Sequence, residues 1–208
     1  MREIPILFSA PMVRALRAGR KTQTRRLANT GRVVGGCLPY FDNMAGHHCN
    51  GDDTPVQQRW SVGDLLWVKE TWARRLDEDA LSASDLTDKT WAWYWADPQT
   101  CNTGCAGGAG KRRQSIFMPR WASRIALRVT DVSVQRLRDI CEEDARAEGV
   151  HWTGRWSDSF SGIAAHDAYG EDILPNVAAY AILWDQINGA GSWASNPWVS
   201  AISFEVAK

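Results

Sequence analysis

The segment Gly19-Arg20-Lys21-Thr22-Gln23-Thr24-Arg25-Arg26 places a lysine, two threonine hydroxyls and three arginines side by side in the chain. The residues before it predict a short helix, because Pro11 suits a first helical turn and the apolar residues after it recur at helical spacing. Gly19 suits the position just after a helix. We therefore expect the cationic segment to begin where a helix ends, as a loop or the start of a strand.

Two interpretations of this segment follow from its residue types. Lysine and arginine are common on protein surfaces, so it could be a solvated basic turn or a general phosphate-binding segment. It could instead be a reaction centre, because neighbouring cations lower the pKa of Lys21 and a neutral lysine can act as general base toward a hydroxyl. The residues alone leave both interpretations open.

Composition limits the class of protein. The chain has 208 residues, of which 44% are hydrophobic and 23% charged, which is typical of one sizeable globular domain. The formal net charge is zero, so any nucleic-acid contact must come from a local patch. No apolar run approaches the roughly 18 residues needed to span a bilayer, and the first residues lack the pattern of a secretory signal. We expect no membrane partner and a cytoplasmic location.

The cysteine and histidine pattern bears on metal binding. Five cysteines are an odd number, which argues against a fully paired disulfide framework. Six residues in two predicted insertions could ligate zinc: Cys37, His47, His48, Cys49, Cys101 and Cys105. The spacing matches zinc motifs poorly, so free thiols in loops are favoured over a structural zinc. No cofactor is expected to be required.

The rest of the chain alternates predicted strands and helices with three insertions, at about 28–60, 77–114 and 151–175. Strands are expected at 4–8, 65–72, 125–134 and 198–206, and a short aromatic strand at 91–95. Pro5 restricts the first strand to an edge or entry position. Helices are expected from Asp139, by its capping-box spacing, to Glu148, with Gly149 as the stop, and over 177–187. This order predicts a small α+β barrel without a second domain.

Several of these stretches together resemble the ASCH family, a branch of the PUA-like β-barrel superfamily, and most of all its longer phage and prophage members. The resemblance covers Ile6 to Ser9 with the following helix, Gly19 to Arg26, Gly63 to Trp72, Met118 to Ile125, Asp139 to Val150 and Leu183 to Val199. It implies a single domain over residues 1–208. That domain would be a curved barrel of five to six strands with flanking helices, with the three insertions as additions.

The resemblance also implies an activity. Small bacterial ASCH proteins include amidohydrolases that remove the acetyl group from N4-acetylcytidine, using a lysine and a threonine of a Gly-x-Lys-Thr-x-Thr motif and a glutamate of a later helix. These positions fall on Lys21, Thr24 and Glu148. Thr24 would attack the acyl carbonyl, Lys21 would accept its proton, and Glu148 would handle protons at the exocyclic nitrogen.

Further residues are candidates for contacting the substrate: Thr22, Arg25, Arg26, Trp67, Glu70, Trp72, Arg120, Trp121 and Arg124. Thr22 could orient Lys21 or donate to the oxyanion. The tryptophans could stack a base, although such residues more often pack in a core. Glu70 could equally be a salt-bridging residue at the end of its strand, and Glu148 a helix-end carboxylate paired with an arginine.

Two other functions remain open. A non-catalytic module for RNA or modified bases would use Lys21, Arg25, Arg26, Arg120 and Arg124 to hold phosphates, and the tryptophans to stack bases. A ribonuclease is the weaker alternative. The expected partner is a modified nucleoside or a nucleic acid, either RNA or phage DNA, and the sequence does not indicate an oligomeric state.

Overall fold

The computed structural model describes residues 1–28, 40–42, 47–49, 59–74, 76, 79, 92–97, 109–150 and 174–207, and the short pieces 40–42 and 47–49 by their backbone alone. The chain forms two compact units. Unit 1 comprises Met1–Arg20, Gly63–Val129 and Phe204–Lys208; unit 2 comprises Lys21–Val62 and Thr130–Ser203.

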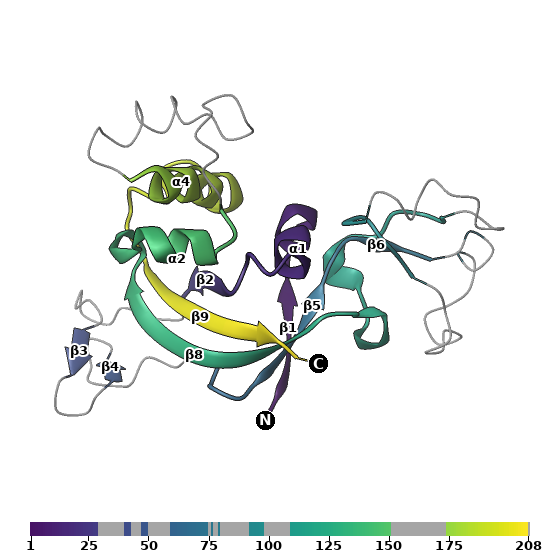
Figure 1. Cartoon of the computed structure of the whole chain (residues 1–208), viewed down its shortest axis with the longest axis horizontal. Coiled ribbons are helices and arrows are strands. Elements are labelled where there is room, and N and C mark those ends of the chain that lie inside the picture. Colours follow the sequence, from purple (N-terminus) through teal and green to yellow (C-terminus); the bar gives the residue numbers. More distant parts are fainter. Residues whose placement is uncertain are drawn as a thin grey trace. The chain divides into compact units, whose positions relative to one another are not determined.

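A five-stranded sheet runs through the chain in the order β1-β5-β8-β9-β2 (Figure 1). Its strands are β1 (Glu3–Leu7), β2 (Gln23–Leu27), β5 (Leu65–Lys69), β8 (Ala126–Arg136) and β9 (Trp198–Val206). The strands β1 and β5 are parallel, whereas β5 with β8 and β2 with β9 are antiparallel. The predicted α+β class is confirmed. The predicted barrel is not closed in the described part of the chain, because β1 and β2 each pair with a single neighbour and form the two edges.

Local signals at the start of unit 1 have the predicted effect. Helix α1 (Ala10–Arg17) carries Pro11 in its first turn, and Gly19 follows it with a φ of 68°, a conformation that glycine adopts without strain. Pro5 lies in the edge strand β1, where its missing N–H does not interrupt a central ladder. The core of unit 1 includes Leu66 and Leu127, which face each other across β5 and β8.

The remaining elements of unit 1 are short. Strand β6 (Trp72–Ala73) pairs with β7 (Trp93–Tyr94), which is the predicted aromatic strand. Two 3-10 helices follow, η3 (Ser115–Phe117) and η4 (Arg120–Ala122).

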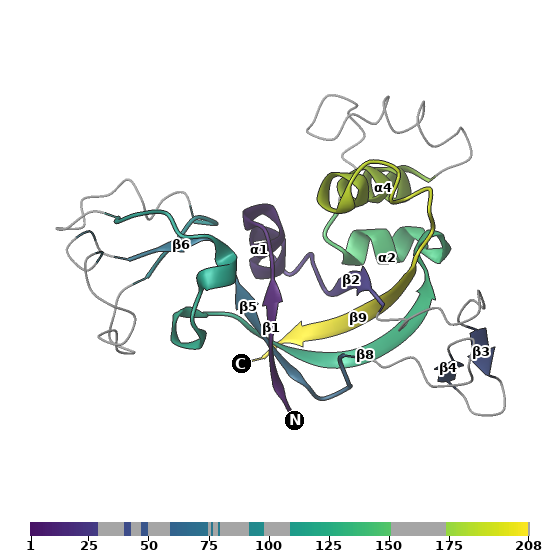
Figure 2. The same cartoon turned by 180° about the vertical axis from the view of Figure 1, so that it is seen from behind.

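In unit 2, helices α2 (Glu142–Ala147) and α4 (Pro175–Asn188) pack against each other, as both views of the chain show (Figures 1 and 2). Their shared core contains Leu137, Ala145, Tyr180, Trp184 and Val199. No helix in the described ranges combines the length and apolar character that a bilayer crossing requires.

One sequence prediction for unit 2, the start of its first helix, is wrong. Helix α2 begins after Cys141, whose Sγ accepts the Asp144 N–H at 3.4 Å, and not at Asp139. Asp139 instead ends the short 3-10 helix η5 (Leu137–Asp139), after which the chain is extended at Ile140. Within the predicted insertion at about 28–60, β3 (Tyr40–Asp42) and β4 (His47–Cys49) form an antiparallel pair. Gly149, with a φ of 87°, follows α2 as predicted.

Candidate functional site

The Lys21 ammonium and the Glu148 carboxylate form a buried ion pair in unit 2. Lys21 pairs with Glu148 in an isolated antiparallel bridge, and the neighbouring Thr22 N–H donates to the Ala147 carbonyl at 2.8 Å. The Lys21 Nζ donates to Glu148 Oε2 and to the main-chain oxygens of Glu148 and Gln23, each at 2.8 Å. The Lys21 side chain is 0% exposed and that of Glu148 is 4% exposed. Three acceptors therefore satisfy an ammonium group that water does not reach.

Arg25 is the second buried cation of this cluster. Its Nη1 donates to Glu148 Oε1 at 3.3 Å and its Nη2 to Asp144 Oδ2 at 2.7 Å, and its side chain is 0% exposed. Gln23 accepts a further bond from Arg25 at 2.6 Å, and the Gln135 amide, turned with its oxygen toward Arg25, accepts two more. Lys21 and Arg25 thus share the Glu148 carboxylate, and Arg25 also pairs with Asp144. Close hydrogen-bonded contacts of this kind are what offset the desolvation of buried charges.

Tyr180 of α4 adds a neutral donor. Its hydroxyl donates to Glu148 Oε1 at 3.4 Å, and the residue is 4% exposed. Burial, followed by the nearby Glu148 charge, raises the pKa of Tyr180 well above its ordinary value, so the hydroxyl keeps its proton. Tyr180 lies in the helix predicted over 177–187 but is not among the predicted site residues. A buried tyrosine usually finds a partner for its hydroxyl, which is the signal that could have identified it.

The pKa of Lys21 is lowered, as predicted, but mainly for another reason. Burial is the largest cause, the Glu148 carboxylate opposes it, and the charges of Arg26 and Arg25 add smaller decreases. Arg20, which the sequence analysis included among the perturbing cations, is exposed and is not among the causes. Burial also lowers the pKa of Arg26.

The two threonines of the motif differ in environment. Thr24 is 1% exposed and lies in β2 opposite Ile202. Side chains alternate along a strand, so Thr24 shares a face of β2 with Arg26 while Arg25 lies on the other face. Thr22 is exposed and precedes the strand. Among the three predicted catalytic residues, the structure brings Lys21 and Glu148 into direct contact and buries Thr24 in the strand that follows Lys21.

The other six predicted site residues lie in unit 1. Two of them, Glu70 and Arg124, form a salt bridge with each other. Arg124 Nε donates to Glu70 Oε1 at 2.8 Å and its Nη2 to Oε2 at 3.0 Å, a bidentate pair with Glu70 only 1% exposed. Arg124 also pairs with Asp97 and lies 3.8 Å from the centre of the Tyr94 ring. This geometry fits the salt-bridge interpretation of Glu70.

The three tryptophans divide into core and surface. Trp72 is 1% exposed and meets Trp121 edge to face at a centroid distance of 5.9 Å, in a cluster with Met118. Trp67 is partly exposed, with Lys69 Nζ 5.4 Å and Arg120 Cζ 5.8 Å from the centre of its ring. Arg120 also pairs with Glu3 at 2.8 Å. Trp72 therefore fits the core interpretation, whereas Trp67 has the cationic surroundings expected of a stacking surface.

The predicted zinc ligands lie where the structure does not describe their side chains. Cys37, Cys101 and Cys105 are outside the described residues, and residues 47–49 are described by their backbone only. Among the side chains that are described, no group of three or more metal-ligating residues occurs. Cys141 is a free, exposed thiol at the start of α2.

Comparisons with known proteins do not assign a family. No family model matches the chain, and no curated protein matches it. A solved structure, protein EF3133 from Enterococcus faecalis V583, described as belonging to family DUF984, is 11% identical, with 100% of this chain and 81% of that chain covered and a TM-score of 0.41. A likeness at this level supports no inference about fold family or function.

Proposed function

We propose that this chain is an ASCH-type amidohydrolase on a PUA-like fold, which removes the acyl group from the exocyclic N4 of an acylated cytidine or cytosine. The observation that carries the proposal is the 2.8 Å contact between Lys21 Nζ and Glu148 Oε2, with both side chains buried. The two residues are 127 positions apart in the chain. The resemblance assigned both to one site from separate motifs, and their direct contact is what such a site requires.

The proposed chemistry uses three side chains. Thr24 Oγ1 passes its proton to Lys21 Nζ and attacks the acyl carbon, which forms a tetrahedral intermediate. This step requires the Thr24 side chain, which lies on the face of β2 opposite Arg25, to move within reach of Lys21 Nζ. The C–N4 bond then breaks, and N4 receives the proton from Lys21 by way of Glu148. Water hydrolyses the ester on Thr24, which releases the carboxylic acid and restores the hydroxyl. The lowered pKa of Lys21 reduces the cost of converting its ammonium, which is paired with Glu148, to the neutral amine that the first step needs.

Because the three proposed catalytic side chains are buried, the mechanism requires a conformational change before substrate can bind. Lys21, Thr24 and Glu148 are 2%, 1% and 5% exposed. A nucleoside therefore reaches them only after the surrounding side chains or backbone move. Such closure would exclude competing water during acyl transfer.

Turnover of N4-acetylcytidine tests the proposal, with cytidine and acetate detected by mass. We expect the unmodified chain to hydrolyse it and Thr24→Val to lose at least about 100-fold in rate, because the nucleophile is gone while side-chain size is kept. Thr130→Val is the matched control, since Thr130 is an exposed threonine of β8 in the same unit. Equal rates for Thr24→Val and the control, with both folded by circular dichroism, contradict the assignment.

A non-catalytic nucleic-acid module is the second candidate. The observation that favours it is Trp67 with two cations near its ring. Such a module would bind single-stranded RNA in a salt-sensitive way without turnover, and Trp67→Ala would weaken binding. Gel analysis of labelled RNA in the same experiment would reveal cleavage if the chain were a ribonuclease.

A further inference from the structure

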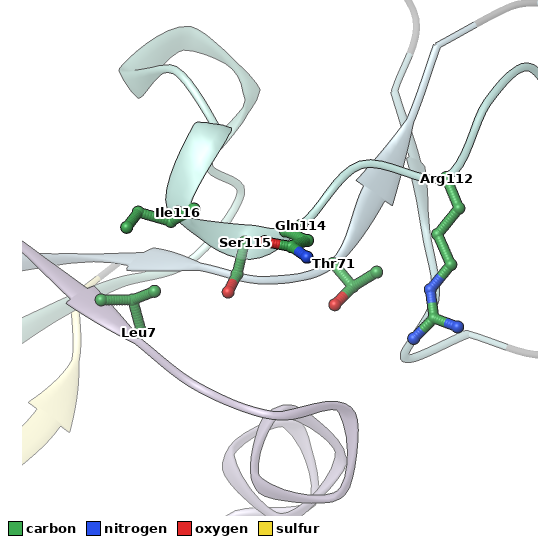
Figure 3. Close-up of a pocket in the computed structure, with 6 residues that line it drawn as sticks. All are labelled: Leu7, Thr71, Arg112, Gln114, Ser115 and Ile116. Carbon is green, nitrogen blue, oxygen red and sulfur yellow. The ribbon is translucent and has the colours of Figure 1, made fainter.

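Unit 1 contains a pocket of about 650 Å³, a volume within the range of small-molecule sites. It is lined by Leu7, Thr71, Arg112, Gln114, Ser115 and Ile116 (Figure 3). None of these residues belongs to the site predicted from the sequence, and all of them lie in unit 1. The pocket is thus a candidate site of its own.

The walls of the pocket are tied to the strands of unit 1. Trp72 and Arg113 exchange main-chain hydrogen bonds of 3.2 and 2.8 Å, which align the segment after Arg112 with strand β6. The Thr71 carbonyl accepts the Trp95 N–H at 3.0 Å. Lys69 Nζ donates to the Ile116 carbonyl and so holds η3 against β5. A site whose walls are fixed in this way is already organised for a ligand.

The lining residues are arranged by polarity. Arg112 is the ionisable side chain among the described lining residues, and no described carboxylate lines the pocket. Figure 3 shows the hydroxyls of Thr71 and Ser115 and the Arg112 guanidinium extending to the same side of their segments, with Leu7 at the end away from Arg112. The guanidinium carbon lies 5.2 Å from the centre of the Trp95 ring, which restricts its position. The pocket therefore has a cationic, hydrogen-bonding end and an aliphatic end.

We propose that this pocket binds a monocarboxylate with an aliphatic body. One guanidinium balances one negative charge, and its planar fork matches a carboxylate, with the two hydroxyls available as further donors. A phosphate dianion would leave a second charge uncompensated by the described lining residues. Leu7 and Ile116 are 46% and 57% exposed, and an aliphatic chain would cover this apolar surface.

Calorimetric titration with octanoate tests the proposal on the full chain. Acetate provides the same head group without the chain, and octylamine provides the same chain with the opposite charge. We expect octanoate to bind and both comparison compounds to bind at least about tenfold more weakly, because each lacks one of the two recognised features.

Two single substitutions locate the binding. Arg112→Gln should weaken octanoate binding about tenfold or more through loss of the charged hydrogen bonds. Lys111→Gln is the control, since Lys111 is the neighbouring exposed cation and does not line the pocket. The proposal is overturned if octanoate does not bind at about 10 mM, if octylamine binds as well, or if both substitutions weaken binding equally. Because Arg112 is exposed, both variants should fold, which circular dichroism checks.

Discussion

Replacing Glu148 by glutamine tests the buried cluster at its centre. Glu148 accepts from Lys21, Arg25 and Tyr180, so the change removes the carboxylate that three donors share. Asp144 still pairs with Arg25, whereas Lys21 loses its carboxylate partner among the described residues, and both cationic side chains are 0% exposed. The substitution keeps the size of the side chain and one carbonyl acceptor, so its effect measures charge and not packing.

The expected loss of stability follows from the geometry. At 2.8 Å and an effective dielectric constant of about 20, the gross attraction between Lys21 and Glu148 is about 6 kcal/mol. Desolvation offsets part of this attraction in the native pair, but removing one partner leaves a buried charge uncompensated, at a cost of about 3–5 kcal/mol. Two main-chain acceptors of Lys21 persist. We therefore expect the free energy of unfolding to fall by about 3 kcal/mol near neutral pH.

The stability lost in Glu148→Gln, relative to the unmodified chain, should become smaller as the pH rises. Burial lowers the native pKa of Lys21, and without the carboxylate that raises it, the pKa falls further. An unfolded lysine titrates near 10.4, so between the native and unfolded pKa values the unfolded chain binds more protons than the native one. Stability then rises with pH, by up to about 1.4 kcal/mol per pH unit. Once Lys21 is neutral, the absence of the Glu148 carboxylate no longer leaves a buried charge without a counterion.

Urea denaturation followed by tryptophan fluorescence, at about pH 7 and about pH 9.5, measures both effects. Glu143→Gln is the matched control, because Glu143 is an exposed glutamate of α2, the helix that Glu148 follows directly, and we expect its effect to stay within about 0.5 kcal/mol. A loss for Glu148→Gln below about 1 kcal/mol, or one that does not change with pH, would refute the assignment of a buried, charge-compensated lysine.

Two further substitutions test other parts of the chain. Arg124→Lys keeps the charge but loses the fork that binds both oxygens of the buried Glu70, so we expect unit 1 to lose about 1–3 kcal/mol, measured by thermal denaturation. Gly149→Ala places a Cβ at a φ of 87° at the end of α2, which should cost about 1–2 kcal/mol in urea denaturation; no loss would mean that the backbone there is relaxed in another conformation.

The fold elements that the sequence predicted correctly are those with local signals. Pro11 and Gly19 bound α1, Pro5 lies in an edge strand, and Gly149 follows α2, because each residue has a backbone preference that acts without distant contacts. The predicted start of α2 was wrong, because the cap is Cys141, whereas the sequence pattern favoured Asp139, two residues earlier and a commoner type of cap. The sequence predicted a closed barrel, whereas β1 and β2 are the unpaired edges of the described sheet. Pairing between distant strands depends on long-range geometry, which local sequence signals do not specify.

The sequence selected two residues of the buried cluster but not the main cause of the lowered pKa of its lysine. Residue types and the family resemblance selected Lys21 and Glu148, yet crowding by arginines was expected to be the main cause of the lowered lysine pKa. Burial is the larger cause, and burial depends on packing that a single sequence does not reveal. Tyr180 was missed for the same reason, because its hydroxyl meets Glu148 only once α4 packs against α2.

A structural role and a catalytic role of the Lys21–Glu148 ion pair require different side chains. As a structural element it needs only compensated charge, so changes at Lys21 or Glu148 would alter stability whether or not the chain is an enzyme. As a catalytic element it also needs the Thr24 hydroxyl, which carries no charge. Thr24→Val therefore separates the roles where the charged substitutions do not. Loss of turnover in a variant that keeps the pH-dependent stability of the cluster would assign chemistry to the site, because charge compensation alone gives no reason for that hydroxyl to matter.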